Sequence, residues 1–330
     1  MIGTTHYLSR KEYHGDWLGT RPPRLTIASG DTVVIETRDA SNGKVRDRIS
    51  DAAFAALPEE MRTMVAAGAE RYKHEVRTEG HALTGPIAIE GAKDGDVLQI
   101  DVLEVKPADW GWSAISPGFG LLADEFPQPY VQFWDLRSGT HAPLGDTIRV
   151  PLEPHLGVMG VSPRTREPMS TIPPRCVGGN VDIKQLTAGS SLFLPIHVDG
   201  ALFSTGDAHA AMGDGEVCGC GIEMESVSTL RFTLRNDLRL SGPRFDLNET
   251  LPGSWNTSGY IGTTGIGPDL YHASQDAIRA MIGVLTENYG LSREEAYCLC
   301  SVAVDLKISE IVDEPNWLVS AFLPKGIFVG

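Results

Sequence analysis

The sequence has no long apolar run and few basic residues for its acid content. No stretch of its 330 residues approaches the roughly eighteen apolar residues of a membrane-spanning helix. The start, MIGTTHYLSRKEYHGDW, lacks the basic and then apolar layout of a signal peptide, so we expect a cytoplasmic protein without membrane contact. Lys and Arg number 28 against 43 Asp and Glu, a net charge of −15 at pH 7. This acidity opposes binding to nucleic acid or to an anionic membrane.

Several motifs of known chemistry are also missing. The cysteines are Cys176 and two C-x-C pairs, 218/220 and 298/300, with no C-x-x-C pair that would mark structural zinc, so we expect free, mostly buried thiols. No strand is followed by G-x-G-x-x-G, and no G-x-x-x-x-G-K-[ST] occurs, which argues against a nucleotide cofactor. The Gly189-Ser190-Ser191 segment continues as LFLP rather than as the glycine-rich segment of Ser-Ser-Lys amidases.

Turns followed by alternating apolar and polar residues dominate what remains. They occur at 29–38, 94–105, 144–153 and 188–198, and each predicts a half-buried strand. Asp199-Gly200 between two apolar alternations predicts a hairpin over 195–204, and 215–235 reads as one or two long strands. The Pro/Gly-rich segments 107–120 and 163–179 are expected to be loops.

Helical patterns are fewer and lie mainly late in the chain. They cover 50–72, broken near Pro58, then 272–290 and 292–312, with Ser274 and Ser292 as expected N-caps and Gly290 as a stop. The length allows two lobes, which we place at 1–170 (β-rich) and 171–330 (α+β), closely packed or continuous.

The segment FSTGDAHAAMGDGE, residues 203–216, concentrates polar chemistry. Asp207 and His209 are two residues apart, so an extended backbone puts both on one face. Carboxylate and imidazole suit zinc and similar ions, and a carboxylate beside a metal-bound water can act as a general base. Asp214 and Glu216 add carboxylates nearby. The same residues are equally compatible with a solvated hairpin turn.

Two further segments supply candidates. In RCVGGNVDIKQL, residues 175–186, Asn180 and Asp182 are two apart after Gly178-Gly179, which fits a turn at least as well as a site. His81 precedes a Thr-Gly-Pro turn and a strand, so it can project from a strand end into a cleft.

The run GGNVDIKQLTAGSSLFLPIHVDGALFSTGDAHAAMGDGEVCGCGIE resembles the acetamidase/formamidase family. PPRLTIASGDTVVIETRDA, HALTGPIAIEGAKDGDVL, HLGVMGVSP and the closing EEAYCLC…GIF segment extend the resemblance across almost the whole chain. The resemblance implies a mainly β fold, a β-sandwich or jelly-roll-like part joined to an α+β part with helices near the C-terminus. It also implies a homodimer or higher homo-oligomer that hydrolyses a small amide to carboxylate and ammonia.

Carried onto matching positions, the resemblance implies one polar site. Its residues are Asp182, Asp207, His209, Asp214, Glu216, Glu223 and His81. We expect a divalent ion, zinc with calcium as the alternative, on Asp182, Asp207, His209 and Asp214. Glu216 would be the base, with Asp182, His209 and Glu223 as further catalytic candidates, and Asn180, with a backbone amide near Gly178-Gly179, the oxyanion contact.

Three points stay open in the sequence. Glu216 and Glu223 are seven residues apart, so they share a site only if the intervening glycines bulge or Glu216 belongs to a turn. Met212 stands where the family pattern suggests Gln, and His155 where it suggests an aromatic residue, and both positions border the expected substrate pocket. The alternatives are hydrolysis of another C–N bond, in a cyclic imide or carbamate, and a non-enzymatic β-sandwich that binds calcium through Asp207, Asp214 and Glu216.

Overall fold

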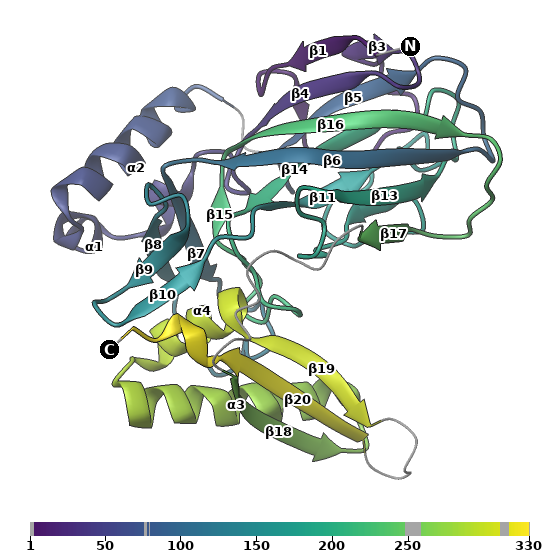
Figure 1. Cartoon of the computed structure of the whole chain (residues 1–330). Coiled ribbons are helices and arrows are strands. Elements are labelled where there is room, and N and C mark those ends of the chain that lie inside the picture. Colours follow the sequence, from purple (N-terminus) through teal and green to yellow (C-terminus); the bar gives the residue numbers. More distant parts are fainter. Residues whose placement is uncertain (1–2, 76–77, 79, 248–258, 311–316, 330) are drawn as a thin grey trace.

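The computed structural model describes residues 3–75, 78, 80–247, 259–310 and 317–329. Two β-sheets form a sandwich, and a smaller unit of helices and strands packs beneath it (Figure 1). The prediction of a mainly β fold with an α+β portion near the C-terminus is confirmed. In the described part of the chain, no helix is long and apolar enough to cross a membrane.

The first sheet has six strands. Their order is β1 (Thr5–Leu8), β4 (Thr32–Thr37), β16 (Ser226–Arg235), β6 (Val97–Pro107), β13 (Ser190–Pro195) and β17 (Arg244–Leu247). Alternate residues of β4 are buried, with Val33 and Ile35 fully enclosed, because a strand sends successive side chains to opposite faces. These buried residues form one face of the core.

The second sheet has nine strands and carries the site. Its main path is β12 (Gly178–Asn180), β11 (His155–Gly160), β14 (Phe203–His209), β15 (Glu223–Met224), β7 (Trp110–Ile115) and β8 (Tyr130–Asp135). Strand β5 (Leu83–Ile89) pairs with β14 and with β2 (Tyr13–His14) and β3 (Leu25–Ile27). Every residue of β11 and β14 is buried, and Phe203 packs edge-on against Phe232 of the first sheet. The site therefore lies on strands that are covered on both faces.

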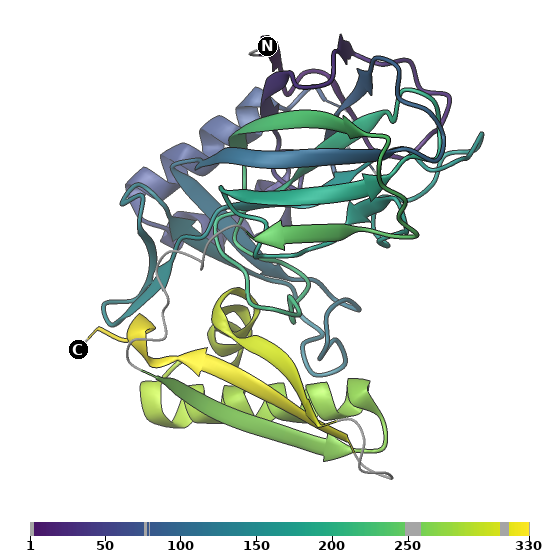
Figure 2. The same ribbon diagram turned by 45° about the vertical axis from the view of Figure 1, so that its right-hand side comes forward.

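Helices close the sides and the lower end of the sandwich. Helices α1 (Asp51–Ala56) and α2 (Glu59–Arg71) follow the short 3-10 helix η1 (Val45–Arg48). At the C-terminus, β18 (Tyr260–Gly267), β20 (Trp317–Pro324) and β19 (Asp305–Glu310) form a sheet that lies along α3 (Leu270–Tyr289), as Figure 2 shows. Helix α4 (Arg293–Ala303) lies between this sheet and the sandwich. Strands β9 (His141–Leu144) and β10 (Ile148–Pro151) form a separate hairpin. The short helix η3 (Lys325–Ile327) follows β20.

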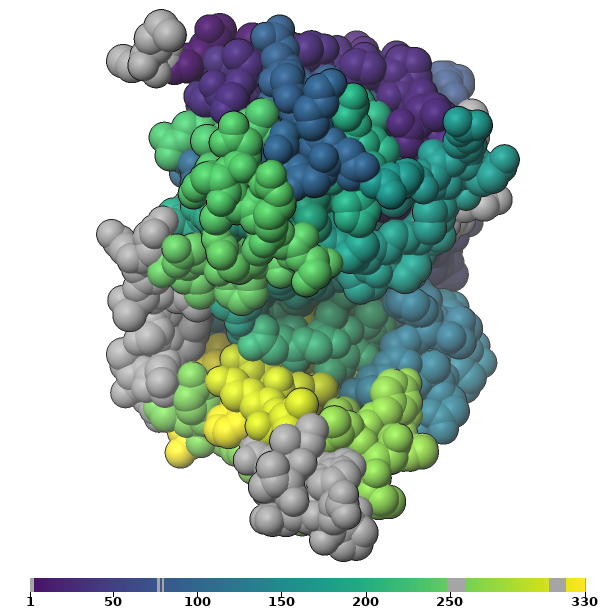
Figure 3. Space-filling view, turned by 90° about the vertical axis from the view of Figure 1, so that its right-hand side faces the viewer, coloured from purple at the N-terminus to yellow at the C-terminus, as the bar shows by residue number. Residues whose placement is uncertain are grey.

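The C-terminal unit is bonded directly to the loop that precedes β15. The Gly213 amide donates to the Ser301 carbonyl at 2.7 Å, and the Leu306 amide donates to the Asp214 carbonyl at 3.0 Å. In the space-filling view, the yellow C-terminal segment lies against the green and teal middle of the chain (Figure 3). The unit therefore braces the turn that contains Glu216.

Most predicted elements are present, with some corrections. The four predicted strands correspond to β4, β6, β10 and β13, and the break at Pro58 separates α1 from α2. Ser292 forms a capping box with Glu295, and Gly290 ends α3 in the left-handed conformation. The N-cap of α3 is Asp269 rather than Ser274, because the Asp269 side chain accepts from the His272 amide.

Four predicted segments are wrong in part. No hairpin spans 195–204: β13 and β14 lie in different sheets. Residues 215–222 form turns, and the strands begin at 223. The predicted loop 107–120 contains β7, and the helix predicted over 292–312 ends at Ala303 and is followed by β19, with 311–312 outside the described residues. Both large sheets combine strands from either side of the expected boundary at 170/171.

Candidate active site

Three neighbouring strands hold the centre of the site. On β14, His209 is opposite His155 of β11 on one side and Glu223 of β15 on the other. The His155 ring lies edge-on to the His209 ring, with centroids 5.2 Å apart, and Nε2 of His209 is 3.1 Å from Oε1 of Glu223. The sheet register therefore fixes an imidazole with a carboxylate beside it.

Asp207 and His209 point to the same side, as their spacing on a strand predicts. Oδ2 of Asp207 is 3.7 Å from Nε2 of His209. A Cβ added to Gly157, on the adjacent strand β11, would be 2.6 Å from Asp182 Oδ1, 2.8 Å from Asp207 Oδ2 and 2.8 Å from His209 Cε1. The three groups thus converge on the space that a side chain at position 157 would occupy.

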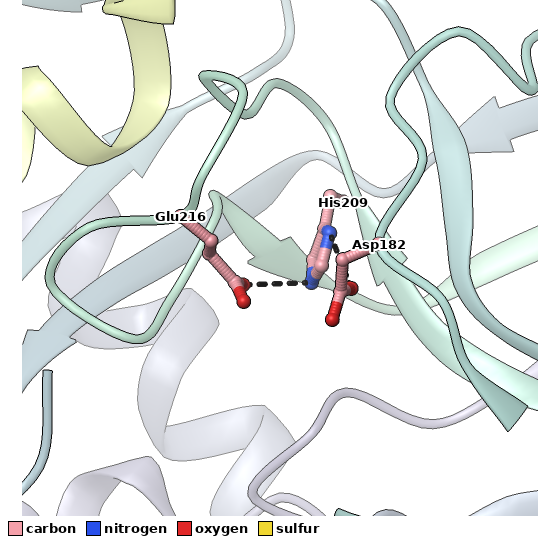
Figure 4. A group of neighbouring side chains, drawn as sticks. All are labelled: Asp182, His209 and Glu216. Carbon is pink, nitrogen blue, oxygen red and sulfur yellow. Dashed lines mark ion pairs between the residues drawn. The ribbon is translucent and has the colours of Figure 1, made fainter. Parts of the chain in front are cut away.

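Asp182 and Glu216 come from turns rather than strands. Oδ1 of Asp182 is 4.0 Å from Nδ1 of His209, and Oε1 of Glu216 is 3.6 Å from its Nε2, so that the two carboxylates flank the ring (Figure 4). Asp182, Asp207 and Glu216 have φ of 45°, 55° and 42°, a region that residues other than glycine rarely adopt. Because Glu216 belongs to a turn, it shares the site with Glu223.

Three of the four carboxylates line a cavity of about 360 Å³. They are Asp207, Glu216 and Glu223, and His81 lines it with them, its Nε2 3.7 Å from Oδ2 of Asp207. The remaining lining residues are Ala40, Ser41, Arg48, Thr78, Gly80, Trp112, Ser116, Phe119, Ile172, Asn180, Gly219 and Cys220.

Burial and mutual repulsion strongly perturb the titration of these groups. Burial, followed by repulsion from Asp207, raises the pKa of Asp182 to about 6. Burial raises the pKa of Glu223 to about 8, and burial with repulsion from Asp182 raises the pKa of Glu216 well above its usual value. Burial also acts on Asp207, but attraction from His81 and His209 outweighs it and lowers that pKa. Four buried carboxylates thus compete for protons or another cation.

The same groups leave hydrogen-bonding capacity unused. Among the described residues, the buried side-chain atoms without a hydrogen-bond partner include Asp182 Oδ1, Asn180 Oδ1, Glu223 Oε2, His81 Nδ1 and both ring nitrogens of His209. Such atoms are costly to bury unless a ligand, ion or water satisfies them. Two groups of residues each bring three possible ligand atoms within 4.8 Å of one another, and they share His209. The groups are Asp182/His209/Glu216 and Asp207/His209/Glu223, so these residues fit a divalent ion.

Sequence comparison identifies the family. The sequence pattern that defines the acetamidase/formamidase family matches residues 4–168 and 164–329. The chain belongs to the acetamidase/formamidase family. It is 27% identical to the formamidase of Methylophilus methylotrophus in an alignment 385 positions long, gaps included, that covers 96% of this chain and 89% of the relative.

Solved structures of this family share the fold. The γ-lactamase from Delftia acidovorans has a TM-score of 0.79 at 26% identity, covering 96% of this chain and 89% of that chain. The acetamidase from Bacillus halodurans has a TM-score of 0.62 at 30% identity, covering 96% of each chain. A structure named γ-lactamase and one named acetamidase thus share the fold of this chain.

Not every expected site residue of this acetamidase/formamidase faces the cavity. The Asp214 carboxylate accepts from Gln185 Nε2 at 3.0 Å and belongs to neither set of ligand atoms. Met212 is buried in a separate small cavity beside Tyr260 and Lys184. The Gly178 amide already donates to the Arg175 carbonyl, so it offers no oxyanion contact.

Gly157 was not among the residues predicted from the sequence. It lies in the apolar run HLGVMG, and a glycine inside a strand pattern indicates a close approach by another group. That signal could have identified it. The side chains that meet above it come from segments 25 and 50 residues away, a proximity that no local pattern encodes.

Proposed function

We propose that the protein hydrolyses the C–N bond of a small primary amide, giving a carboxylate and ammonia. The observation that carries this proposal is the group of four carboxylates around His209, three of which line the cavity. Amide hydrolysis needs a base for water, an acid for the departing nitrogen and charge stabilisation at the carbonyl oxygen. The family membership supports the same reaction class.

Glu216 is the residue we assign as base and then acid. Its carboxylate has no donor within hydrogen-bond geometry among the described residues and lines the cavity, so it can take a proton from water and pass it to the leaving nitrogen. Glu223 is more constrained, because its Oε1 accepts from the Gly221 amide at 3.0 Å and lies beside His209. We therefore assign Glu223 to hold and orient His209.

Asn180 and His81 are proposed to position the substrate. The Asn180 side chain presents its oxygen, an acceptor that suits the amide N–H₂ rather than the developing oxyanion. His81 lines the same cavity and can donate to the carbonyl oxygen.

A divalent ion, with zinc the first candidate, is proposed on His209 together with Asp182 and Asp207, which belong to different sets of ligand atoms that share His209. Carboxylate and imidazole are donors that zinc accepts, and buried acids without enough cations favour such an ion. When bound, it would lower the pKa of water and polarise the carbonyl group. The calcium alternative is weakened because Asp214 is turned to Gln185.

A cyclic amide is the second candidate substrate. The similarity to a γ-lactamase structure favours it, since opening a lactam breaks the same type of bond. We also propose a cytoplasmic location, which the five free cysteines favour, and a homo-oligomeric assembly that light scattering would test.

Ammonia release from formamide and acetamide tests the proposal, with ring opening of a γ-lactam assayed in parallel. Glu216→Gln should lower kcat by at least about 10²-fold while metal content and the unfolding transition stay unchanged. Glu287→Gln, an exposed residue of α3, is the matched control. Near-normal turnover by the Glu216 variant would remove it from the mechanism, and no C–N cleavage by the metal-loaded native protein would refute the function.

A further inference from the structure

The cavity is much larger than formamide or acetamide requires. It encloses about 360 Å³, whereas a molecule of three or four heavy atoms needs on the order of 100 Å³, a few times the ~30 Å³ share of a water molecule. The carboxylates are only part of the lining. A cation and apolar side chains line the same cavity, and the hydrolysis of an amide group does not use them.

The cation is Arg48. Arg48, at the end of η1, lines the cavity, and its guanidinium carbon lies 5.2 Å from the centre of the Trp112 ring. Its one hydrogen bond to a described residue is Nη1 to Ser116 Oγ at 3.4 Å, and it has no ion pair with a described acidic residue. A guanidinium has five N–H donors, so most of its capacity remains available to a ligand.

Trp112 lies between a carboxylate and this cation. Its backbone pairs with Glu223 across β7 and β15, while its ring faces Arg48. Phe119 and Ile172 also line the cavity and are 51% and 40% exposed, so both offer apolar surface to a ligand. A ligand with a short apolar chain would cover them and reach Arg48.

Arg48 differs clearly from its neighbour Arg46. Both belong to the four-residue helix η1, but Arg46 pairs with Asp51, lies over the Phe54 ring and does not line the cavity. Arg46 thus has an ion-pair partner within the chain, whereas Arg48 lines the cavity without one among the described residues.

We propose that the substrate is the monoamide of a short dicarboxylic acid. Its amide would lie at the carboxylates, its methylene groups against Trp112 and Phe119, and its free carboxylate on Arg48 in a charge-assisted pair. This inference rests on the proposed amide hydrolysis and adds the substrate class and a specificity-determining residue. The chemistry is unchanged: water adds to the amide carbon, the C–N bond breaks, and ammonia leaves with a dicarboxylate.

The test compares succinamate with butyramide and succinamide, which have similar length but no negative charge. We expect kcat/KM for succinamate to exceed that for either neutral amide by about 10- to 100-fold. Arg48→Gln should lower kcat/KM for succinamate to the level of the neutral amides, whereas Arg46→Gln should keep the preference. Malonamate and glutaramate then define the chain length.

Two outcomes would overturn the inference. One is equal or better turnover of the neutral amides by the native protein, and the other is an unchanged preference in the Arg48 variant. If acetamide and all other amides are inert, the proposed function fails separately. In that case, calorimetric binding of succinate to the native protein and to Arg48→Gln still decides whether Arg48 binds a carboxylate, and equal affinities would refute it.

Discussion

Gly157→Ala is the sharpest test of how the site is built, because it changes no polar group. The new methyl would lie 2.6 Å from Asp182 Oδ1, and 2.8 Å from both Asp207 Oδ2 and His209 Cε1, where ordinary contacts begin at 3.4 Å. Each of the three groups must therefore retreat by roughly 0.6–0.8 Å, although Asp207 and His209 belong to a strand in which every residue is buried. The substitution pushes apart the groups that the site holds together.

The expected cost has two parts. Overfilling a packed interior destabilises a protein by about 1–3 kcal/mol. Displacement of reacting groups by about 1 Å can lower turnover about 10²-fold, so we expect kcat/KM to fall by roughly 10- to 100-fold. Bound metal, counted per folded chain, should fall as well, since all three displaced residues are the proposed ligands.

Ammonia release, metal content and urea unfolding should be measured on the same preparations. Gly262→Ala is the matched control, because Gly262 is an exposed strand glycine with no atom within 4 Å of an added Cβ. Near-native turnover and metal content in Gly157→Ala would contradict the convergence of these groups above Gly157.

Two other predictions concern the metal and pH. Removal of the metal with a chelator should abolish turnover and lower Tm, and zinc should restore both; full activity of the metal-free protein would contradict the proposed ion. Burial, followed by repulsion from Arg21, lowers the pKa of His14 to about 4, while its unfolded value is about 6.5. His14 must be neutral in the folded protein, so the free energy of unfolding is undiminished above pH 6.5 and falls by about 3 kcal/mol as the pH drops to 4. The free energy of unfolding in urea should therefore differ less between pH 7 and pH 4.5 for His14→Gln than for the native protein. An equal difference in both proteins would refute this.

Local patterns predicted several of the strands and helix ends. Turn chemistry and alternation identified β4, β6, β10 and β13, and side-chain capping identified the start of α4, because these signals act within a few residues. The hairpin at Asp199-Gly200 failed for a reason that the turn cannot encode. Ala201 and Leu202 also adopt positive φ, 62° and 57°, and carry the chain into the other sheet.

The site was predictable only in part. Asp207 and His209 follow from their two-residue spacing on one strand. Asp182 and Glu216 were candidates that fitted turns equally well, and only the family resemblance joined them with His209 in one site; both adopt positive φ. Asp214 shares the acidic GDGE segment, yet its side chain is turned to Gln185. Spacing cannot decide which acid of a turn points inward, because the decision depends on backbone angles and on partners elsewhere in the chain.

The order of strands in the six-stranded sheet has a consequence for synthesis on the ribosome. Strand β16 lies between β4 and β6, but it is made more than a hundred residues after both. Until β16 has been made and has left the ribosome, β4 and β6 each have an unpaired edge facing a gap. A chain that ends before residue 223 also lacks Glu223. A nascent chain of two-thirds length is thus both catalytically incomplete and open to pairing with other chains.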